Sequence, residues 1–433
     1  MSGTIATNAP SNRVLSIDVL RGLTIALMIL VNDPGDWAHT YSQLDHAVWN
    51  GFTLTDLVFP NFLFLVGASI ILSLDSRIRR SPSGTLDSAT RRLLALHILR
   101  RTATLLALDF FFNLYPHFHF TRLRIYGVLT RIALCYFAVA LLCLITRKAA
   151  NLFAIVIAIL LGYWALMRFV PVPHAGIPTR DMPILDPVNN LAAWLDRSVT
   201  GFLQRTLHTG RLYLHTSDPE GLLSTLPAIA TTLLGSITAL MLRRTGVGTT
   251  PRQIENTATA GTAPEPTLIT ETITPEHCAI GLFLCGLLGL AIGSFWNLWF
   301  PINKNLWTSS YVIFAAGWAL LALATFYWLI DIRRLNETKA GKRLTWPWLV
   351  FGSNAIVAFC VSEFLVENLT WLKIPSSLGP NGKPVTAWFW IYHNLFAFHG
   401  STNNTSLAFA IAFVAVCFLP NWLLYRKRIF LKI

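Results

Sequence analysis

Long apolar runs alternate with short polar segments along most of the chain. Ten of these runs have about the length of roughly 20 residues that an α-helix needs to cross a bilayer. The pattern therefore predicts an all-α polytopic membrane protein with about ten transmembrane helices. The predicted spans are residues 15–31, 54–74, 93–114, 125–145, 152–170, 222–242, 279–295, 309–330, 346–366 and 407–424.

Three further segments do not fit a simple span. The apolar segment 388–398 is too short to cross a bilayer and is interpreted as an extracytoplasmic or re-entrant helix. Segment 171–220 contains Trp194 and several charged residues, and it predicts an extracytoplasmic loop that caps the bundle. Segment 245–276 is rich in Thr, Ala, Pro and Glu without apolar periodicity, which predicts a flexible cytoplasmic loop.

Composition and charge support the membrane class. Of the 433 residues, 54% are hydrophobic and 13% are charged, whereas about a quarter of a typical soluble protein is charged. The basic residues behind the net charge of +13 lie in short clusters beside the apolar runs, which favours positive-inside topology over nucleic-acid binding. These clusters follow alternate spans, so we expect both terminal tails, residues 1–14 and 426–433, to be cytoplasmic. The loop at residues 33–51 then faces outward.

The cysteines add no obvious chemistry. All six lie within apolar runs or at the start of one, and none has CxxC spacing. They are interpreted as small buried hydrophobic residues, so we expect neither a disulfide framework nor a metal site.

Several ionisable residues lie in or beside the predicted spans. A charge at the centre of a bilayer costs a few kcal/mol or more, so these side chains should point into the bundle. Asp18 and Arg21 are three residues apart on one helix face and can pair. Arg124 and Arg131 are two helical turns apart, and two guanidinium groups on one face suit an anionic ligand such as phosphate. The alternative is a set of neutralising pairs that only fixes helix packing.

The polar segment 33–60 is the strongest candidate for a functional site. It places Asp45, His46, Trp49 and Asn50 at the lip of a predicted span. Polar groups at this position cost free energy, so such a cluster is expected to bind a ligand or to carry out chemistry. The alternative is an interfacial aromatic anchor followed by a helix cap.

Other polar residues recur on the predicted outward side. Asp218 and Glu220 precede one span, Lys304 and Trp307 precede another, and Asn354 lies near the start of a third. Each alone is an ordinary cap or interfacial residue. Together they indicate a polar substrate such as a sugar.

Six stretches, in order along the chain, carry a family resemblance. They are SIDVLRGLTIALMILVN (16–32), HAVWNGFTLTDLVFPNFLFLVG (46–67), RIYGVLTRIALCYF (124–137), DPEGLLSTLPAIATTLLG (218–235), FPINKNLWTSSYV (300–312) and FGSNAIVAF (351–359). On these stretches the chain resembles the heparan-alpha-glucosaminide N-acetyltransferase family and its bacterial relatives, which are multi-spanning membrane acetyltransferases. Thr130 stands where the family pattern has Gln.

The resemblance implies a reaction and a catalytic residue. The family moves acetyl from cytoplasmic acetyl-coenzyme A, as co-substrate, to the amine of a terminal glucosamine across the membrane, without a metal. The histidine of its His-Ala-x-Trp-Asn-Gly motif is regarded as catalytic, and here it is His46. Residues 15–425 would then form the transmembrane acyltransferase domain.

The motif residues suggest how the transfer proceeds. His46 can act as a base on the acceptor amine or carry the acetyl group itself, and both routes stay open. Asp45, Asp56 or Asp18 would orient the imidazole. Asn50 would donate to the developing oxyanion.

The remaining candidates are assigned to the two substrates. We expect Arg131 and Arg124, with Asp18 and Arg21, at the coenzyme site. The candidates for binding the acceptor are Trp49, Asp218, Glu220, Lys304, Trp307 and Asn354.

Two other functions remain open at this stage. One is a permease for amino sugars, which would need no acetyl-coenzyme A. The other is an acyltransferase with a different donor or an O-acceptor. The family's animal enzyme has a leader domain before this core, and its lack here leads us to expect a bacterial inner membrane. The partners are then the lipid bilayer and an amino-sugar or glycan substrate, with no nucleic acid and a homo-oligomer left open.

Overall fold

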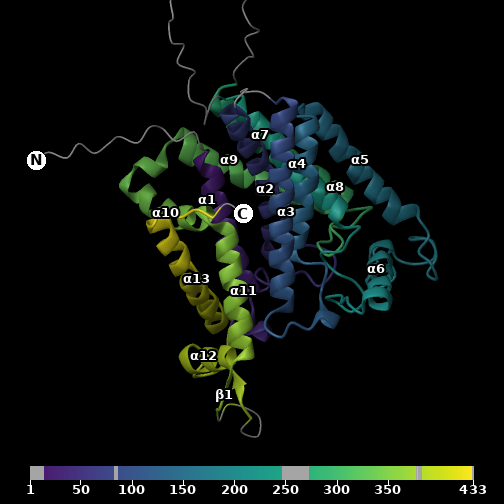
Figure 1. The fold of residues 1–433 in the computed structure, drawn as a ribbon, viewed down its shortest axis with the longest axis vertical. Helices are drawn as coiled ribbons and strands as arrows, with labels where there is room; N and C mark the ends of the chain where they lie inside the picture. Colours follow the sequence, from purple (N-terminus) through teal and green to yellow (C-terminus); the bar gives the residue numbers. More distant parts are fainter. Residues whose placement is uncertain (1–13, 82–85, 246–272, 377, 379–382, 432–433) are drawn as a thin grey trace, which may run out of the picture.

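A computed structural model describes residues 14–81, 86–245, 273–376, 378 and 383–431. Within them the chain is almost entirely helical (Figure 1). The helices are α1 (Leu15–Asn32), α2 (Leu54–Arg80), α3 (Ser88–Leu114), α4 (Val128–Ile145), α5 (Ala149–Phe169), α6 (Leu191–Leu207), α7 (Thr225–Arg243), α8 (Pro275–Trp296), α9 (Ser309–Phe326), α10 (Lys339–Ser353), α11 (Ala355–Trp371), α12 (Ala387–Leu395) and α13 (Asn403–Arg426). Strands β1 (Lys373–Ile374) and β2 (Val385–Thr386) pair antiparallel, with Lys373 opposite Thr386.

The all-α polytopic class is confirmed, with a somewhat lower count of spans. Eight of the described helices are long and apolar enough to cross a membrane, or nine if the bent pair α10 and α11 is one span. The predicted span 93–114 lies in α3, which carries Arg100, Arg101 and Asp109 and is too polar to qualify. The predicted span 346–366 is not straight, because α10 and α11 meet at an angle of 77°.

The three irregular segments have different outcomes. The segment 388–398 forms the short helix α12, as expected. The segment 171–220 contains the 17-residue helix α6, which the sequence analysis had treated as loop. Most of the cytoplasmic loop predicted at 245–276 lies outside the described residues, as does nearly all of the N-terminal tail, residues 1–13.

Helix α2 lies inside the bundle and packs very closely against α7. A Cβ atom on Gly67 would lie 1.8 Å from the carbonyl oxygen of Thr232, and one on Gly235 would lie 1.8 Å from that of Phe64. Only glycine allows the two backbones to approach this far. The Ser236 hydroxyl also donates to the carbonyl of Gly67 at 2.9 Å. These contacts fix α2 against α7 around the middle of α2.

Four loops meet at one end of the bundle, because successive helices run in alternating directions. They follow α1, α3, α5 and α8, and the one after α5 includes α6. The amide of Gly51 donates to the carbonyl of Ile302 at 2.7 Å. The indole of Trp49 donates to the carbonyl of Leu185 at 2.8 Å. We call this the site end of the bundle; it lies in the lower half of Figure 1, with α6 on the right-hand side.

Candidate active site

The first turn of α2 holds Asp56 in place. Thr53 and Asp56 form a capping box, in which one carboxylate oxygen, Oδ2, accepts from the backbone amide of Thr53 at 3.0 Å. The same oxygen accepts from the backbone amide of Ala47 at 3.0 Å. The side chain is 1% exposed. Since Oδ2 is fully engaged in shaping the loop, Oδ1 is left for another partner.

That partner is His46. Its ring nitrogen Nδ1 lies 2.8 Å from Oδ1 of Asp56, and the imidazole is 40% exposed. A carboxylate accepts hydrogen bonds, so this contact favours the tautomer with the proton on Nδ1. The other nitrogen, Nε2, then carries a lone pair at an accessible position. A buried carboxylate that orients an exposed imidazole is the arrangement used for general-base catalysis.

Lys304 completes the cluster from a distant part of the chain. Its Nζ lies 3.0 Å from Nδ1 and 3.2 Å from Nε2 of His46, and 3.6 Å from Oδ1 of Asp56. With Nδ1 protonated, Nε2 is the ring nitrogen that can accept from the ammonium, and Lys304 has to turn away from Nε2 before that nitrogen takes a proton from another group. Burial lowers the pKa of Lys304, while Asp56 and Glu220 act in the opposite direction. The cluster therefore brings together an imidazole, the carboxylate that orients it and an ammonium group, all within 3.6 Å of one another.

Asn303 positions the loop that carries Lys304. This side chain is fully buried. Its amide nitrogen donates to the carbonyl of Trp49 at 2.9 Å and to Oδ1 of Asn50 at 3.2 Å. The second bond leaves the amide nitrogen of Asn50 available as a donor. The sequence analysis did not select Asn303, because a buried Asn in a loop has no distinguishing pattern.

Tyr311 supports Asp56 from the first turn of α9. Pro60 lies inside α2 and has no N–H, so the carbonyl of Asp56, four residues earlier, lacks its helical donor. The buried hydroxyl of Tyr311 donates to this carbonyl instead. A proline in α2 thus creates the acceptor that ties α9 to the first turn of α2. Only the spatial arrangement reveals this role of Tyr311.

The other aspartates proposed to orient His46 do not contact the ring. The carboxylate of Asp45 accepts from the backbone amide of His46 at 2.7 Å and so caps the loop. Asp18 accepts from Arg21 at 2.6 Å near the start of α1, whereas His46 follows the end of that helix. Asp56 is therefore the one of the three candidates that the structure places against the imidazole.

A second charged cluster lies beside the first at the site end. Nε and Nη2 of Arg124 donate to the two carboxylate oxygens of Asp218 at 2.8 and 2.6 Å, and Nη2 also donates to Glu220 at 2.6 Å. Burial lowers the pKa of Arg124, but the bonds and charges of both carboxylates outweigh it and the net shift is upward. Two carboxylates would repel a phosphate at this position. The geometry therefore counts against Arg124 as a ligand of coenzyme phosphates and leaves it a structural cation.

Arg131 lies in the first turn of α4 and is buried inside the bundle. It is 1% exposed, and Nη2 donates to the carbonyl of Gly221 at 3.1 Å and to the hydroxyl of Ser224. Its guanidinium lies 5.0 Å from the ring centre of Trp307. Within the described part of the chain, Nε and Nη1 of Arg131 have no hydrogen-bond partner. Trp307 is itself 1% exposed, so its ring supports Arg131 and is not presented to an acceptor as the sequence analysis expected.

Three of the predicted site residues lie at the opposite end of the bundle. Arg21 bonds Asp18 and also donates to the carbonyl of Gly352 at 2.6 and 3.0 Å, near the bend between α10 and α11. Asn354 binds the segment after α13, through the carbonyl of Ile429 at 3.1 Å and the amide of Leu431 at 2.8 Å. The structure therefore does not bring Asn354 together with the other residues expected to bind the acceptor.

The motifs and the geometry agree with comparisons to known proteins. Residues 13–192 match the model of the family described as heparan-alpha-glucosaminide N-acetyltransferase, catalytic. The heparan-alpha-glucosaminide N-acetyltransferase of Homo sapiens is 27% identical over 467 residues, and the match covers 97% of this chain and 60% of that protein. The protein of the same name from Mus musculus is 28% identical over 396 residues, covering 82% of this chain and 54% of that protein.

The chain thus spans little more than half the length of these relatives. The family match includes the loop with His46 and the helices α2 and α4. The resemblance indicated by the six motifs is confirmed: over most of its length, this chain is similar to the heparan-alpha-glucosaminide N-acetyltransferases.

Proposed function

We propose that the protein is a membrane N-acetyltransferase that moves acetyl from acetyl-coenzyme A to the amine of a glucosamine-type sugar. The observation that carries the proposal is the 2.8 Å contact between the buried carboxylate of Asp56 and the exposed imidazole of His46. The family similarity supplies the substrate classes. A glucosamine-ended glycan is taken as the acceptor because that group is part of the relatives' name.

The residues suit direct transfer to an amine. With Asp56 holding the proton on Nδ1, Nε2 of His46 takes a proton from the acceptor ammonium. The amine then attacks the thioester carbonyl carbon. A C–N bond forms, the C–S bond breaks, and the amide nitrogen loses its second proton. The leaving thiolate takes one proton, so one proton is released overall.

Two donors suit the developing oxyanion. One is the ammonium of Lys304, 3.2 Å from Nε2 of His46. The other is the amide nitrogen of Asn50 in the same loop, whose oxygen is held by Asn303. Hydrogen-bond donors that are held in place before reaction stabilise such a charge without reorganisation, and one donor contributes about 3–4 kcal/mol. An acetyl group carried by His46 itself is the alternative route, and it uses the same orienting carboxylate.

A cationic group far from His46 suits the phosphates of the coenzyme. The guanidinium carbon of Arg101 lies 4.5 Å from the ring centre of Tyr136, and its Nε has no hydrogen-bond partner among the residues that the structure describes. Arg21 and Arg77 lie close enough to repel it. Arg77 and Tyr136 line one small hollow together with His97. Arg21 is paired with Asp18, but Arg77 and Arg101 form no ion pair among the described residues, and such guanidinium groups favour phosphate, unlike the neutralised Arg124.

The proposal includes an orientation. The basic clusters of the sequence put the arginine group on the cytoplasmic side and His46 outside. The donor would then reach across the bundle from the cytoplasm, and the acceptor would approach from outside in a bacterial inner membrane. Labelling of single cysteines placed at positions 48 and 337 by a membrane-impermeant reagent tests this orientation.

The test of function uses purified protein in nanodiscs with isotope-labelled acetyl-coenzyme A and glucosamine-ended oligosaccharides. Products are read by mass spectrometry. His46→Ala is compared with His39→Ala, because His39 also pairs with an aspartate, Asp36, at 2.7 Å in the same loop. We expect labelled N-acetyl product from the wild type and His39→Ala, and none from His46→Ala.

Each other result has a defined meaning. Loss of product in both variants would point to the loop fold and not to His46. Label on a hydroxyl of the acceptor would favour an O-acyltransferase. Uptake of amino sugar into proteoliposomes, with neither donor binding nor product, would favour a permease.

A further inference from the structure

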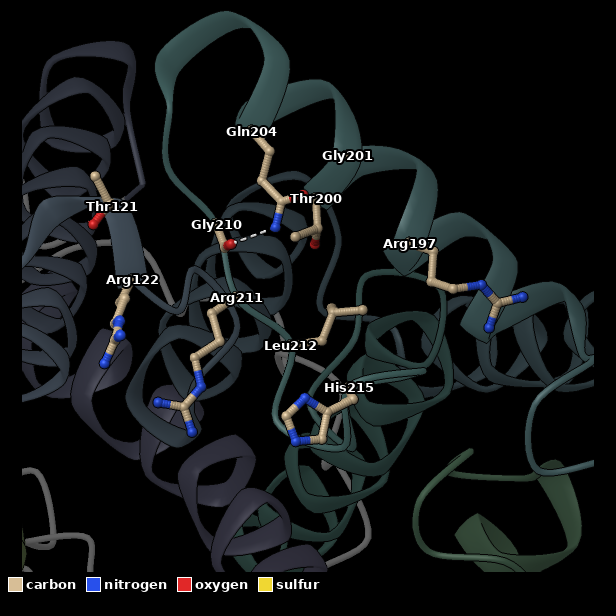
Figure 2. Close-up of a pocket in the computed structure, with 10 residues that line it drawn as sticks. All are labelled: Thr121, Arg122, Arg197, Thr200, Gly201, Gln204, Gly210, Arg211, Leu212 and His215. Atoms are coloured by element: carbon tan, nitrogen blue, oxygen red, sulfur yellow. Dashed lines mark hydrogen bonds between the residues drawn. The ribbon is translucent and has the colours of Figure 1, made fainter.

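A basic pocket lies at the site end, away from the His46 cluster. It has a volume of about 480 Å³. One wall is the loop between α3 and α4, with Arg122. The other wall is α6 and the segment that follows it, with Arg197, Gln204, Arg211 and His215. Figure 2 shows the side chains of Arg122, Arg211 and His215 turned to the same side of the pocket, and Arg197 pointing away from them.

Hydrogen bonds within the protein connect the two walls of the pocket. The helix α6 ends at His208, which has a left-handed backbone with φ of 50°. Gln204 donates to the carbonyl of Gly210 at 2.8 Å and closes the turn that follows (Figure 2). The hydroxyl of Thr209 donates to the carbonyl of Phe120 in the opposite wall. The pocket is therefore formed before any ligand arrives.

The pocket carries positive charge without acidic partners. Among the described residues, no carboxylate forms an ion pair with Arg122 or Arg211, and both side chains are exposed. The nearby acids are engaged elsewhere: Asp218 accepts from Arg124, and Asp196 accepts from a backbone amide. Two guanidinium forks on facing walls suit an anion that has several oxygens, such as a phosphate.

Exposed apolar side chains surround this charge. Phe120 is 64% exposed beside Arg122, Phe202 is 57% exposed on α6, and Leu207 is 65% exposed at its end. Leu214, next to His215, is exposed as well. A site for a soluble anion would not need large exposed apolar side chains around it. Arginines mixed with exposed aromatic and aliphatic groups on an amphipathic helix are typical of a surface that lies in the headgroup region of a bilayer.

The position of α6 agrees with this environment. It lies at the edge of the molecule beside the end of α5, not over the centre of the bundle (Figure 1). A helix at the periphery, at the level where α5 ends, meets lipid headgroups. The apolar residues named above would then face acyl chains while the arginines reach phosphate.

We propose that this pocket binds the phosphate of an anionic phospholipid and so anchors α6 and the loop between α3 and α4 to the membrane surface. The proposal does not depend on the acetyltransferase assignment. Each cation near a membrane surface adds about a fivefold gain in affinity for anionic lipid, so two should give about thirtyfold.

The test uses the full chain in detergent, titrated with short-chain phosphatidylglycerol and, in parallel, with phosphatidylcholine of the same chain length. Binding is read by native mass spectrometry. We expect preference for phosphatidylglycerol, and a loss of about thirtyfold in its affinity in Arg122→Gln/Arg211→Gln. The matched control is Arg205→Gln, an exposed arginine of α6 that does not line the pocket, whose affinity should stay within about twofold.

Two results would overturn the proposal. One is unchanged phosphatidylglycerol affinity in the double variant. The other is displacement of the lipid by inorganic phosphate or by a soluble acidic oligosaccharide as readily as by the lipid itself, which would make this a site for soluble anions. Melting temperature and elution volume check the fold. If the double variant does not fold, each single variant should still lose about fivefold.

Discussion

Replacing Asp56 by Asn removes one buried charge and hardly changes the shape of the side chain. Oδ2 of Asp56 accepts from the backbone amides of Ala47 and Thr53, at 3.0 Å each. These amides can only donate, so the oxygen of the new side chain must take this position. Its NH₂ group then faces Nδ1 of His46 and must donate to it. Nδ1 becomes an acceptor, and the ring proton moves to Nε2.

The consequence for rate follows from this tautomer. A protonated Nε2 cannot take a proton from an amine, and it is also a poor nucleophile. Positioned general acid–base catalysis contributes about 10²–10⁴ in rate, so kcat/KM should fall by that factor, or about 3–5 kcal/mol in the barrier. The cost to folding is smaller, about 1–2 kcal/mol, because the backbone bonds survive with a neutral acceptor.

The assay measures acetyl transfer in nanodiscs at saturating acetyl-coenzyme A, together with the melting temperature. The matched control is Asp36→Asn, because Asp36 holds His39 at 2.7 Å in the same loop and also accepts from a backbone amide. We expect Asp36→Asn to keep its activity. If a folded Asp56→Asn protein kept kcat/KM within about threefold of the wild type, the tautomer argument would be refuted.

Three further predictions concern other parts of the molecule. Lys304→Met should lower kcat about 10²–10³-fold through loss of an oxyanion donor, with acetyl-coenzyme A binding by calorimetry unchanged; an unchanged kcat would remove Lys304 from the mechanism. Burial raises the pKa of Asp196 to about 7, so the folded state favours its neutral form, and the stability it contributes should be lost as pH rises toward 7. Asp196→Asn should flatten this part of the melting profile, and an unaltered slope would contradict the assignment. Gly235→Ala should lower the melting temperature sharply, because the new methyl would lie 1.8 Å from a backbone oxygen of α2, whereas Gly281→Ala, with open space around it, should not.

The sequence predicted the class of the protein and one part of its site. The length and polarity of an apolar run can be read from the local sequence. Inside a bilayer such a run forms a helix, because its backbone N–H and C=O groups must form hydrogen bonds with one another. The His46 motif could also be located, since it is one of six stretches along the chain that carry the family resemblance. The capping of α2 by Thr53 and Asp56 is likewise local, and it places the carboxylate that holds His46.

The partners of that motif depended on the packing of distant helices. Lys304 lies 258 residues from His46, and no periodicity relates them. Arg124 is suited to phosphate by its residue type alone, but two carboxylates nearly 100 residues away neutralise it. Asn354 has the composition of a binding residue and yet lies at the opposite end of the bundle, against the segment after α13. The residue type determines the charge of a side chain and the hydrogen bonds that it can form. Whether that side chain remains free to bind a ligand depends on the partners that the tertiary structure places beside it.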